Sequence, residues 1–280
     1  MIASFKAEFR KLSQRPAIWW LGGMTIAVVA LIYGFAYLRY NAPTFKPDPG
    51  VALATLKATL YPANFARTVV QDLPLVGGAL MVVLGALVVG SEYSWVTLKT
   101  VYTQGPGRAR VLLGQVMALS VITAGLTLAM YALAAVLSLV IATADNGATS
   151  WPAGMTVLKA VGGTWLILEC WTLFGMAMAF LLRQSAMAIG LGVAYMMAIE
   201  GILFVALGTL NISWLTSVEK FFVGQNANAI GTSFGQAISV RGLGSTVQLV
   251  PANQAVLVVA LYTVAFVVLG VVLARRRDVA

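Results

Sequence analysis

The feature that most constrains this chain is a series of long apolar runs separated by polar segments. A helix needs about 20 apolar residues to cross roughly 30 Å of hydrocarbon. Six runs meet or approach that length: residues 17–38, 73–90, 111–142, 156–182, 186–210 and 255–274. Because a backbone in lipid must satisfy its own hydrogen bonds, these runs predict an all-α polytopic membrane protein. We expect six transmembrane helices in a single transmembrane domain over residues 1–280.

The composition excludes an ordinary soluble domain. The chain is 60% hydrophobic and only 10% charged, with a mean hydropathy of +0.90. Soluble domains carry about 25% charged residues. The chain has one cysteine and no histidine, which excludes an internal disulfide and disfavours a transition-metal site. Cys170 lies in an apolar run, where a buried, unreactive thiol is expected.

The distribution of Lys and Arg predicts that both termini lie on the cytoplasmic side. With this topology the inner segments hold 11 Lys and Arg in 46 residues, and the outer segments hold 6 in 89. This bias has the sign of the positive-inside rule, so membrane topology explains the net charge of +9 better than nucleic-acid binding does. A cleaved signal peptide is disfavoured, because the first apolar run is too long and no small-x-small cleavage site follows it.

Residues 1–16 have the pattern of a basic amphipathic helix. Ile2, Phe5, Phe9 and Leu12 fall on one face, and the other face is rich in Lys and Arg. Such a helix either lies in the membrane interface or is a simple positive anchor for the first span. Both interpretations place it in the cytoplasm.

Two outer segments are longer than simple turns. Residues 39–72 are polar and proline-containing, and a short helix is expected near residues 51–60. Residues 211–253 form the longest outer segment, where interfacial or re-entrant helices are possible, for example at 214–222. The run at 111–142 exceeds an ordinary span, so we expect it to tilt or to project beyond the bilayer.

A polar-amphipathic stretch lies between the second and third apolar runs. Tyr93, Trp95 and Leu98 form an apolar stripe at helical spacing, and residues 104–107 end the pattern with Gly and Pro. We expect a cytoplasmic helix at about 92–103. From the residues alone it is either an interfacial helix that rests on lipid or a helix that docks into the groove of a partner.

This stretch also carries a family resemblance. The chain resembles the permease subunit of a type-2 ABC exporter over most of its length: a basic N-terminal helix, six spans and a long outer segment before the last span. Members tend to have a Glu after span two, a Gly-Thr-Leu-Lys/Arg element, a small-residue turn with Arg, and a Lys that enters span three. The matching residues are Glu92, Thr97, Leu98, Lys99, Gly105 and Arg108. Val96 and Gln115 depart from the pattern, at positions where Gly and Lys are usual. Residues 221–227 also look like the family's outer segment.

The resemblance implies an assembly. Two permease copies or paralogues would pair with two cytoplasmic ATPase subunits in a bacterial inner membrane. Residues 92–103 would be the coupling helix, with Glu92, Tyr93, Trp95, Thr97, Leu98, Lys99, Gly105 and Arg108 at the ATPase. The chain has no Gly-x-x-x-x-Gly-Lys-Ser/Thr motif, so ATP and magnesium would bind to the partner rather than to this chain, which would itself be no enzyme. The cargo would be an amphipathic drug, antibiotic, peptide or lipid-like molecule.

Two carboxylates fall near the middle of apolar runs. Glu169 and Glu200 would lie near the bilayer midplane, on neighbouring spans joined by a short turn, where they could approach each other. Intramembrane carboxylates are functional candidates. They could contact cargo, carry protons, or form interhelical hydrogen bonds that fix packing. A proton-coupled secondary transporter that uses both is therefore an alternative, and an intramembrane enzyme is a third class for which no nucleophile–base pair is evident.

Small residues and methionines complete the list of candidate contact positions. Gly22–Gly23 and the Gly190–Gly192–Ala194 series could let helices approach closely, within the chain or at a dimer seam. The methionines of the fourth and fifth runs would either fill the core or line a path for apolar cargo. They are Met176, Met178, Met187, Met196 and Met197.

Overall fold

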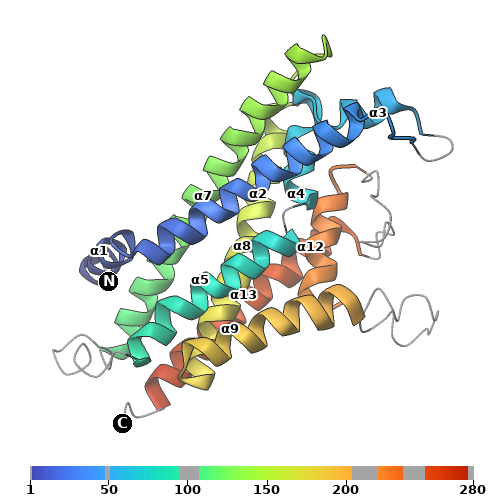
Figure 1. The fold of residues 1–280 in the computed structure, drawn as a ribbon. Helices are drawn as coiled ribbons and strands as arrows, with labels where there is room; N and C mark the ends of the chain where they lie inside the picture. The colour runs from blue at the N-terminus through green and yellow to red at the C-terminus, as the bar shows by residue number, and fades with distance from the viewer. Residues whose placement is uncertain are drawn as a thin grey trace.

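The computed structural model describes residues 2–47, 51–72, 74–94, 107–203, 218, 220–235 and 250–276, and the structural account concerns these residues. Their regular elements are all helices (Figure 1). In chain order they are α1 (Ile2–Ser13), α2 (Pro16–Asn41), α3 (Leu53–Ala58), η1 (Pro62–Asn64), α4 (Phe65–Asp72), α5 (Pro74–Ser94), α7 (Arg108–Ala144), α8 (Gly154–Leu182), α9 (Ser185–Ala194), η2 (Tyr195–Leu203), α12 (Val223–Thr232) and α13 (Ala252–Arg276).

Five described helices are long and apolar enough to cross a membrane. They are α2, α5, α7, α8 and α13. The chain is therefore a multi-pass helical membrane protein, as the apolar runs predict. In the run at 186–210, α9 continues into the π-helix η2 and the described helix reaches Leu203. Residues 204–210 lie outside the described residues, so the sixth span stays a prediction.

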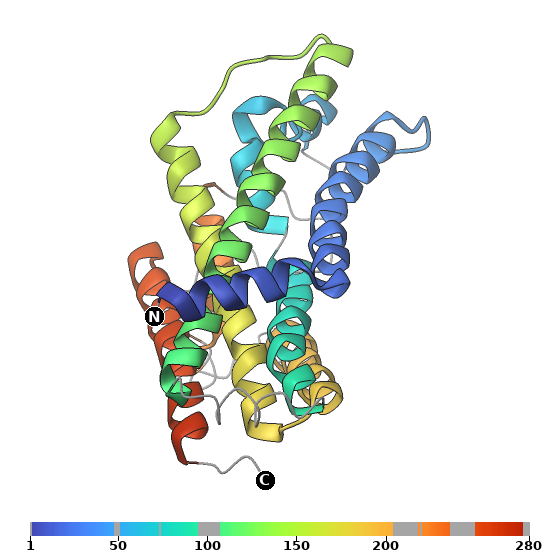
Figure 2. The ribbon, with the colours of Figure 1, turned by 90° about the vertical axis from the view of Figure 1, so that its left-hand side faces the viewer.

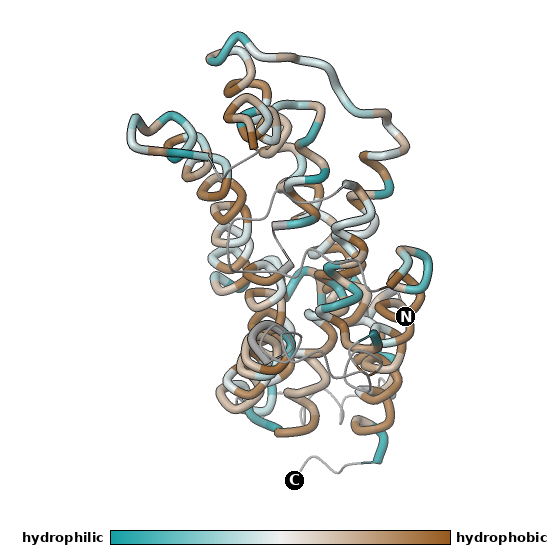
Figure 3. Tube along the Cα trace, turned by 90° about the vertical axis from the view of Figure 1, so that its right-hand side faces the viewer, coloured by the Kyte–Doolittle hydropathy of each residue, from teal (hydrophilic) through white to brown (hydrophobic). Residues whose placement is uncertain are grey.

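Apolar side chains on the outside of the bundle fit a lipid surrounding. In Figure 3 the long helices are mostly brown, the colour of hydrophobic residues, and teal is frequent in the described turns and helix ends. On α2 the stripe that includes Leu21, Thr25 and Val29 is buried, whereas Leu31, Phe35 and Leu38 are exposed. The buried stripe packs on α7, which leaves the other face for acyl chains.

The longest of the described helices, α7, extends past the rest of the bundle at its C-terminal end (Figure 1). Its 37 residues correspond to about 56 Å at 1.5 Å per residue. That length exceeds the roughly 30 Å of hydrocarbon, so the prediction that this helix tilts or projects beyond the bilayer stands.

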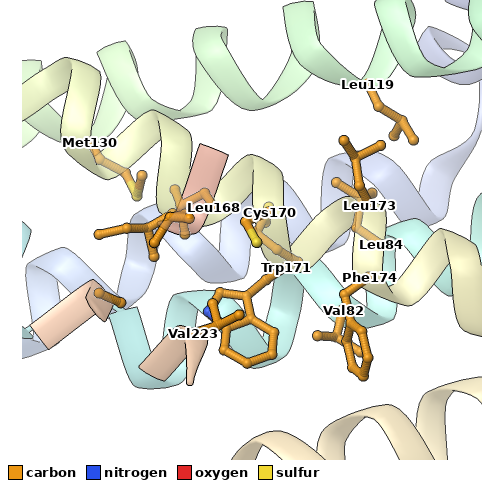
Figure 4. Close-up of a cluster of buried hydrophobic side chains, with 14 of the residues drawn as sticks. Val82, Leu84, Leu119, Met130, Leu168, Cys170, Trp171, Leu173, Phe174 and Val223 are labelled. Carbon is orange, nitrogen blue, oxygen red and sulfur yellow. The ribbon is translucent and has the colours of Figure 1, made fainter. Parts of the chain in front are cut away.

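The core is built around α8, which packs most extensively on α5. Most side chains of α8 from Ile167 to Phe180 are buried. Trp171, Phe174 and Val82 belong to one cluster of buried side chains (Figure 4). The rings of Trp171 and Phe174 meet edge to face at a centroid distance of 5.7 Å.

Two glycines let α5 and α8 approach backbone to backbone. A Cβ at Gly85 would lie 1.8 Å from the Thr172 carbonyl oxygen, and a Cβ at Gly175 would lie 2.1 Å from the Val82 carbonyl oxygen. Small residues at membrane helix interfaces permit such contact. This seam of Gly85 and Gly175 is the close approach that the sequence did not reveal.

The glycines singled out from the sequence behave differently from one another. A Cβ at Gly22 would meet Leu126 at 2.9 Å and one at Gly192 would meet Val82 at 2.8 Å, so both serve packing within the chain. Gly23 and Gly190 have nothing within 4 Å of a Cβ. The methionines also divide, since Met176 and Met196 are buried in the core and Met187 and Met197 are exposed.

Short helices pack beside the long ones: η1 and α4 contact α7, and α12 contacts α4 and α13. α3 forms inside the expected 51–60 range, whereas η1 and α4 were not foreseen in the 39–72 segment. Gln71 Nε2 of α4 donates to the carbonyl oxygens of Gly231 at 3.1 Å and Gly235 at 2.5 Å. These bonds tie α4 to α12 and its C-terminal turn. Of the 214–222 helix expected from the sequence, most lies outside the described residues.

Candidate functional site

Most of the residues proposed for coupling lie within the segment 95–106, which is outside the described residues, and the others flank it. Trp95, Thr97, Leu98, Lys99 and Gly105 are in that segment. Glu92 and Tyr93 lie in the last turn of α5, which continues four residues past the expected end of the second span. Arg108 is the first residue of α7. The described part of the candidate site is therefore the junction where α5 ends and α7 begins.

Glu92 is the centre of this junction. Its side chain is 4% exposed, and it accepts hydrogen bonds from two other helices. Lys11 of α1 donates its Nζ proton to Oε1, and Gln115 of α7 donates from Nε2 to Oε2 at 2.7 Å. A charge-assisted hydrogen bond is about twice as strong as a neutral one. One buried carboxylate thus joins α1, α5 and α7.

Arg15 strengthens the same junction from the loop between α1 and α2. Its NH1 donates to Ser91 Oγ at 2.8 Å, and its NH2 lies 4.0 Å from Glu92 Oε1. We call Lys11, Arg15, Glu92 and Gln115 the inner junction. Gln115, one of the two departures from the pattern described above, thus donates directly to Glu92.

The helix α1 lies across the bundle and not along it (Figure 2). It packs mainly on α7, where a Cβ at Gly114 would be 3.0 Å from Ser4. Glu8, also in α1, is buried and forms an ion pair with Lys11 at 2.6 Å. Burial raises the pKa of the Glu8 carboxyl against the opposing effect of Lys11. The helix α1 therefore buries an acid together with the apolar Leu12.

Tyr93 faces the interior of the protein. Its ring meets that of Phe180 in α8 edge to face, at a centroid distance of 6.2 Å and an interplanar angle of 85°. The apolar stripe expected from Tyr93 onward therefore begins with a residue that packs on this chain's own core.

The carboxylate of Glu169 has a complete set of partners. Ser120 Oγ donates to Oε1 at 2.5 Å, and Thr123 Oγ1 donates to Oε2 at 2.6 Å. Both donors lie on α7, three residues apart and therefore on one face of that helix. This geometry matches the packing interpretation, in which the carboxylate holds α8 against α7.

The carboxylate of Glu200 is only partly satisfied. It lies on η2, is 7% exposed, and its Oε2 accepts a hydrogen bond from the backbone N–H of Gly224 in the first turn of α12. The N–H of Val223 also contributes. Oε1 is buried without a hydrogen-bond partner. The Tyr195 hydroxyl lies close to the same carboxylate.

The two intramembrane carboxylates do not form a pair. Glu169 bonds to α7 and Glu200 to α12, and they share no hydrogen-bond partner. Cys170 is buried and free, as expected. Among the described residues, no group of three or more His, Cys, Asp or Glu could hold a metal ion.

Sequence reasoning missed Lys11, Ser120, Thr123 and Gly224 as partners of these carboxylates. The spacing of Ser120 and Thr123 was a usable signal, because hydroxyls at i and i+3 in an apolar run point to one buried acceptor. Nothing in the sequence pointed from Glu200 to Gly224, since no regular element was expected at 223–232.

Comparison with known proteins adds no family assignment. No protein-family model matches this chain, and no curated protein is significantly similar to it.

Proposed function

We propose that this protein is the permease subunit of an ATP-driven ABC exporter, coupled to a separate cytoplasmic ATPase. The cargo would be amphipathic, such as a drug, an antibiotic, a peptide or a lipid-like molecule. Two permease copies or paralogues and two ATPase subunits would complete the transporter in a bacterial inner membrane. The direction of transport follows from the family resemblance of residues 92–115.

The observation that carries the proposal is the inner junction. Segment 95–106 begins and ends at helices that Glu92 joins, through Gln115 between α5 and α7 and through Lys11 to α1. A force applied to that segment by a partner would reach α5, α7 and α1 together. A motor needs such a rigid attachment, because a flexible attachment would absorb the motion.

The packing beyond the junction continues the same path. α5 is packed backbone to backbone on α8 through Gly85 and Gly175, and Gly90 contacts Ser185 at the start of α9. Motion of the end of α5 would therefore reach both α8 and α9. Close-packed contacts transmit displacement because interiors have low compressibility.

A proton-coupled carrier that relays protons between Glu169 and Glu200 is less well supported. A relay needs acceptors that exchange a proton directly or through a shared group. These two carboxylates have separate partners on different helices. The ATP-driven permease therefore accounts for more of the observed contacts.

Co-purification with an ATPase tests the proposal. The full-length chain would be expressed together with a Walker A protein encoded beside it, and pulled down from detergent. Trp95→Asp and Leu98→Asp should each lower the recovered ATPase by about tenfold or more, because a charge opposed to an apolar groove costs about 1.4 kcal/mol or more. Trp151→Asp is the matched control, since Trp151 is 51% exposed at the outer start of α8 and should leave recovery unchanged.

Two outcomes would contradict the proposal. One is that the isolated chain in liposomes moves cargo without ATP or a partner. The other is that the Trp95→Asp and Trp151→Asp proteins retain the ATPase equally. A junction variant, Lys11→Met, adds a second readout: ATPase binding should persist while cargo-stimulated ATP hydrolysis falls.

A further inference from the structure

We propose that Glu200 is a proton-binding site, and that its protonation state controls how firmly α12 is held against η2. The inference goes beyond the proposed permease function and needs no ATPase partner. It starts from the contrast between the two oxygens of one buried carboxylate. Oε2 is held by a backbone N–H of α12, whereas Oε1 is buried with no partner.

The contact at Oε2 favours the charged form of Glu200. The first N–H groups of a helix have no partner inside the helix and carry a partial positive charge. Glu200 meets the N–H groups of Val223 and Gly224, the first two residues of α12. A carboxylate therefore caps α12, in the place that a side chain of the N-cap residue usually takes. Phe222 is that residue and provides no side-chain cap.

The buried Oε1 favours the neutral form. A charged oxygen without a hydrogen bond in an apolar interior is costly, and a proton on the carboxyl removes the charge. The carboxylate is thus balanced between an anion that caps α12 and a neutral acid that suits the surroundings. Small changes in its environment would move the proton on or off.

Among the described residues, the titratable groups that face this carboxylate provide no opposite charge. They are Tyr195 on η2, Tyr262 on α13 and Cys170 on α8, and α12 itself has no titratable side chain. Glu169, the nearest carboxylate along α8, bonds to α7. A proton is therefore the ligand that fits. A metal ion is disfavoured here, because it would have a single carboxylate as its ligand and would be repelled by the positive end of α12.

The surrounding backbone permits the contact to open. Glu200 lies in a π-helical stretch, a geometry that is rare and frequent at functional sites. The contact also requires a glycine at position 224, because a Cβ there would lie 2.6 Å from Glu200 Oε2. α12 in turn packs on α13 and is tied to α4 through Gln71. Release of the cap would loosen the group of outer helices between the long spans.

Amide hydrogen exchange across residues 223–232 tests the proposal in the full-length protein in lipid nanodiscs. Protection would be corrected for intrinsic exchange and compared with α7 as internal reference, from about pH 5 to about pH 9. The wild-type protection of α12 should fall about tenfold as the pH is lowered, because a hydrogen bond to a charged acceptor is lost on protonation. Glu200→Gln should show the low protection at every pH.

Two further variants separate the proton site from a general packing effect. Glu169→Gln removes the other intramembrane charge and should keep the wild-type pH dependence of α12. Gly224→Ala keeps the carboxylate but blocks its approach, so α12 should be loosened at every pH. A direct titration should show about one proton fewer bound by Glu200→Gln than by wild type over the same range.

The outcomes that overturn the proposal are specific. One is wild-type α12 protection that does not change with pH after correction. A second is Glu200→Gln with the wild-type pH dependence, and a third is Gly224→Ala with undiminished protection.

Discussion

Glu169 and Glu200 are both buried in the protein, yet their surroundings differ in one respect that matters. Glu169 lies on α8 with a hydroxyl donor for each of its oxygens. Glu200 lies on η2 with backbone donors at one oxygen and no partner at the other. The first carboxylate is complete within the static structure, whereas the second is not. Burial alone therefore does not determine whether an acid is structural or functional.

The helices that carry the two acids differ in the same direction. α8 is a regular helix in backbone contact with α5, whereas η2 is π-helical and its partner α12 is a helix of 10 residues. A satisfied acid on a tightly packed helix fixes a position. A half-satisfied acid on an irregular helix is suited to two states. If α8 and Glu169 hold a fixed position, substitutions there should have large effects on stability, and the largest is considered first.

The largest effect is expected at the α5–α8 seam. Gly175→Leu would put a Cβ 2.1 Å from a backbone carbonyl oxygen of α5, which a side-chain rotation cannot relieve. Overpacking costs about 3 kcal/mol or more in such a place. We expect loss of monodisperse protein on gel filtration in detergent.

Gly190→Leu is the matched control for this prediction. Gly190 is an exposed helical glycine with nothing within 4 Å of a Cβ, so its variant should behave as wild type within about 0.5 kcal/mol. Equal yields of the two variants would show that the seam is not tightly packed, and the contrast between α8 and η2 would fail.

The next effect is expected at the satisfied carboxylate. Glu169→Ala removes two interhelical hydrogen bonds and should lower the free energy of unfolding by about 2 kcal/mol, measured by unfolding in mixed detergent micelles. The cost is limited because Thr123 can also bond within α7, to the carbonyl of Ser120 at 3.1 Å. Glu200→Ala also removes a buried oxygen that has no hydrogen-bond partner, so it should cost less than Glu169→Ala; the reverse order would contradict the comparison.

The sequence predicted the existence of the spans better than their contacts. A run of apolar residues is sufficient to identify a membrane helix, which is why five described helices fall where the runs lie. The rotation of each helix about its axis is not encoded in the same way. A helix such as α8 is apolar on all sides, so no polar face shows which residues meet a neighbour. For this reason Gly85 and Gly175 were missed while Gly190 was suggested.

The acidic residues of the candidate site could be predicted from the sequence, but the residues that bond to them could not. Glu92, Glu169 and Glu200 stand out because charged residues in or beside apolar runs are costly. Their donors come from 23 to 81 residues away along the chain, as in the pairs of Gln115 and Lys11 with Glu92. Such pairing depends on tertiary packing. α4 and α12 were missed because they are short and lie in segments whose composition resembles that of loops.

The smallest effect is expected at a third buried acid, Glu8 in α1. One lysine, Lys11, serves both Glu8 and Glu92, and Glu92 has Gln115 in addition. Burial raises the pKa of Glu8 above its ordinary value of 4.5, so folding favours the protonated acid. Its contribution to stability is therefore present below pH 4.5 and is lost as the pH rises through the raised pKa.

Glu8→Gln should make the protein more stable than wild type at neutral pH by about 1 kcal/mol or less, and this gain should shrink as the pH falls. Unfolding midpoints at several pH values would measure the gain. A variant that is less stable than wild type at neutral pH would mean that the ion pair with Lys11 outweighs the cost of burial, and Glu8 would then join Glu169 as an acid whose partners suffice.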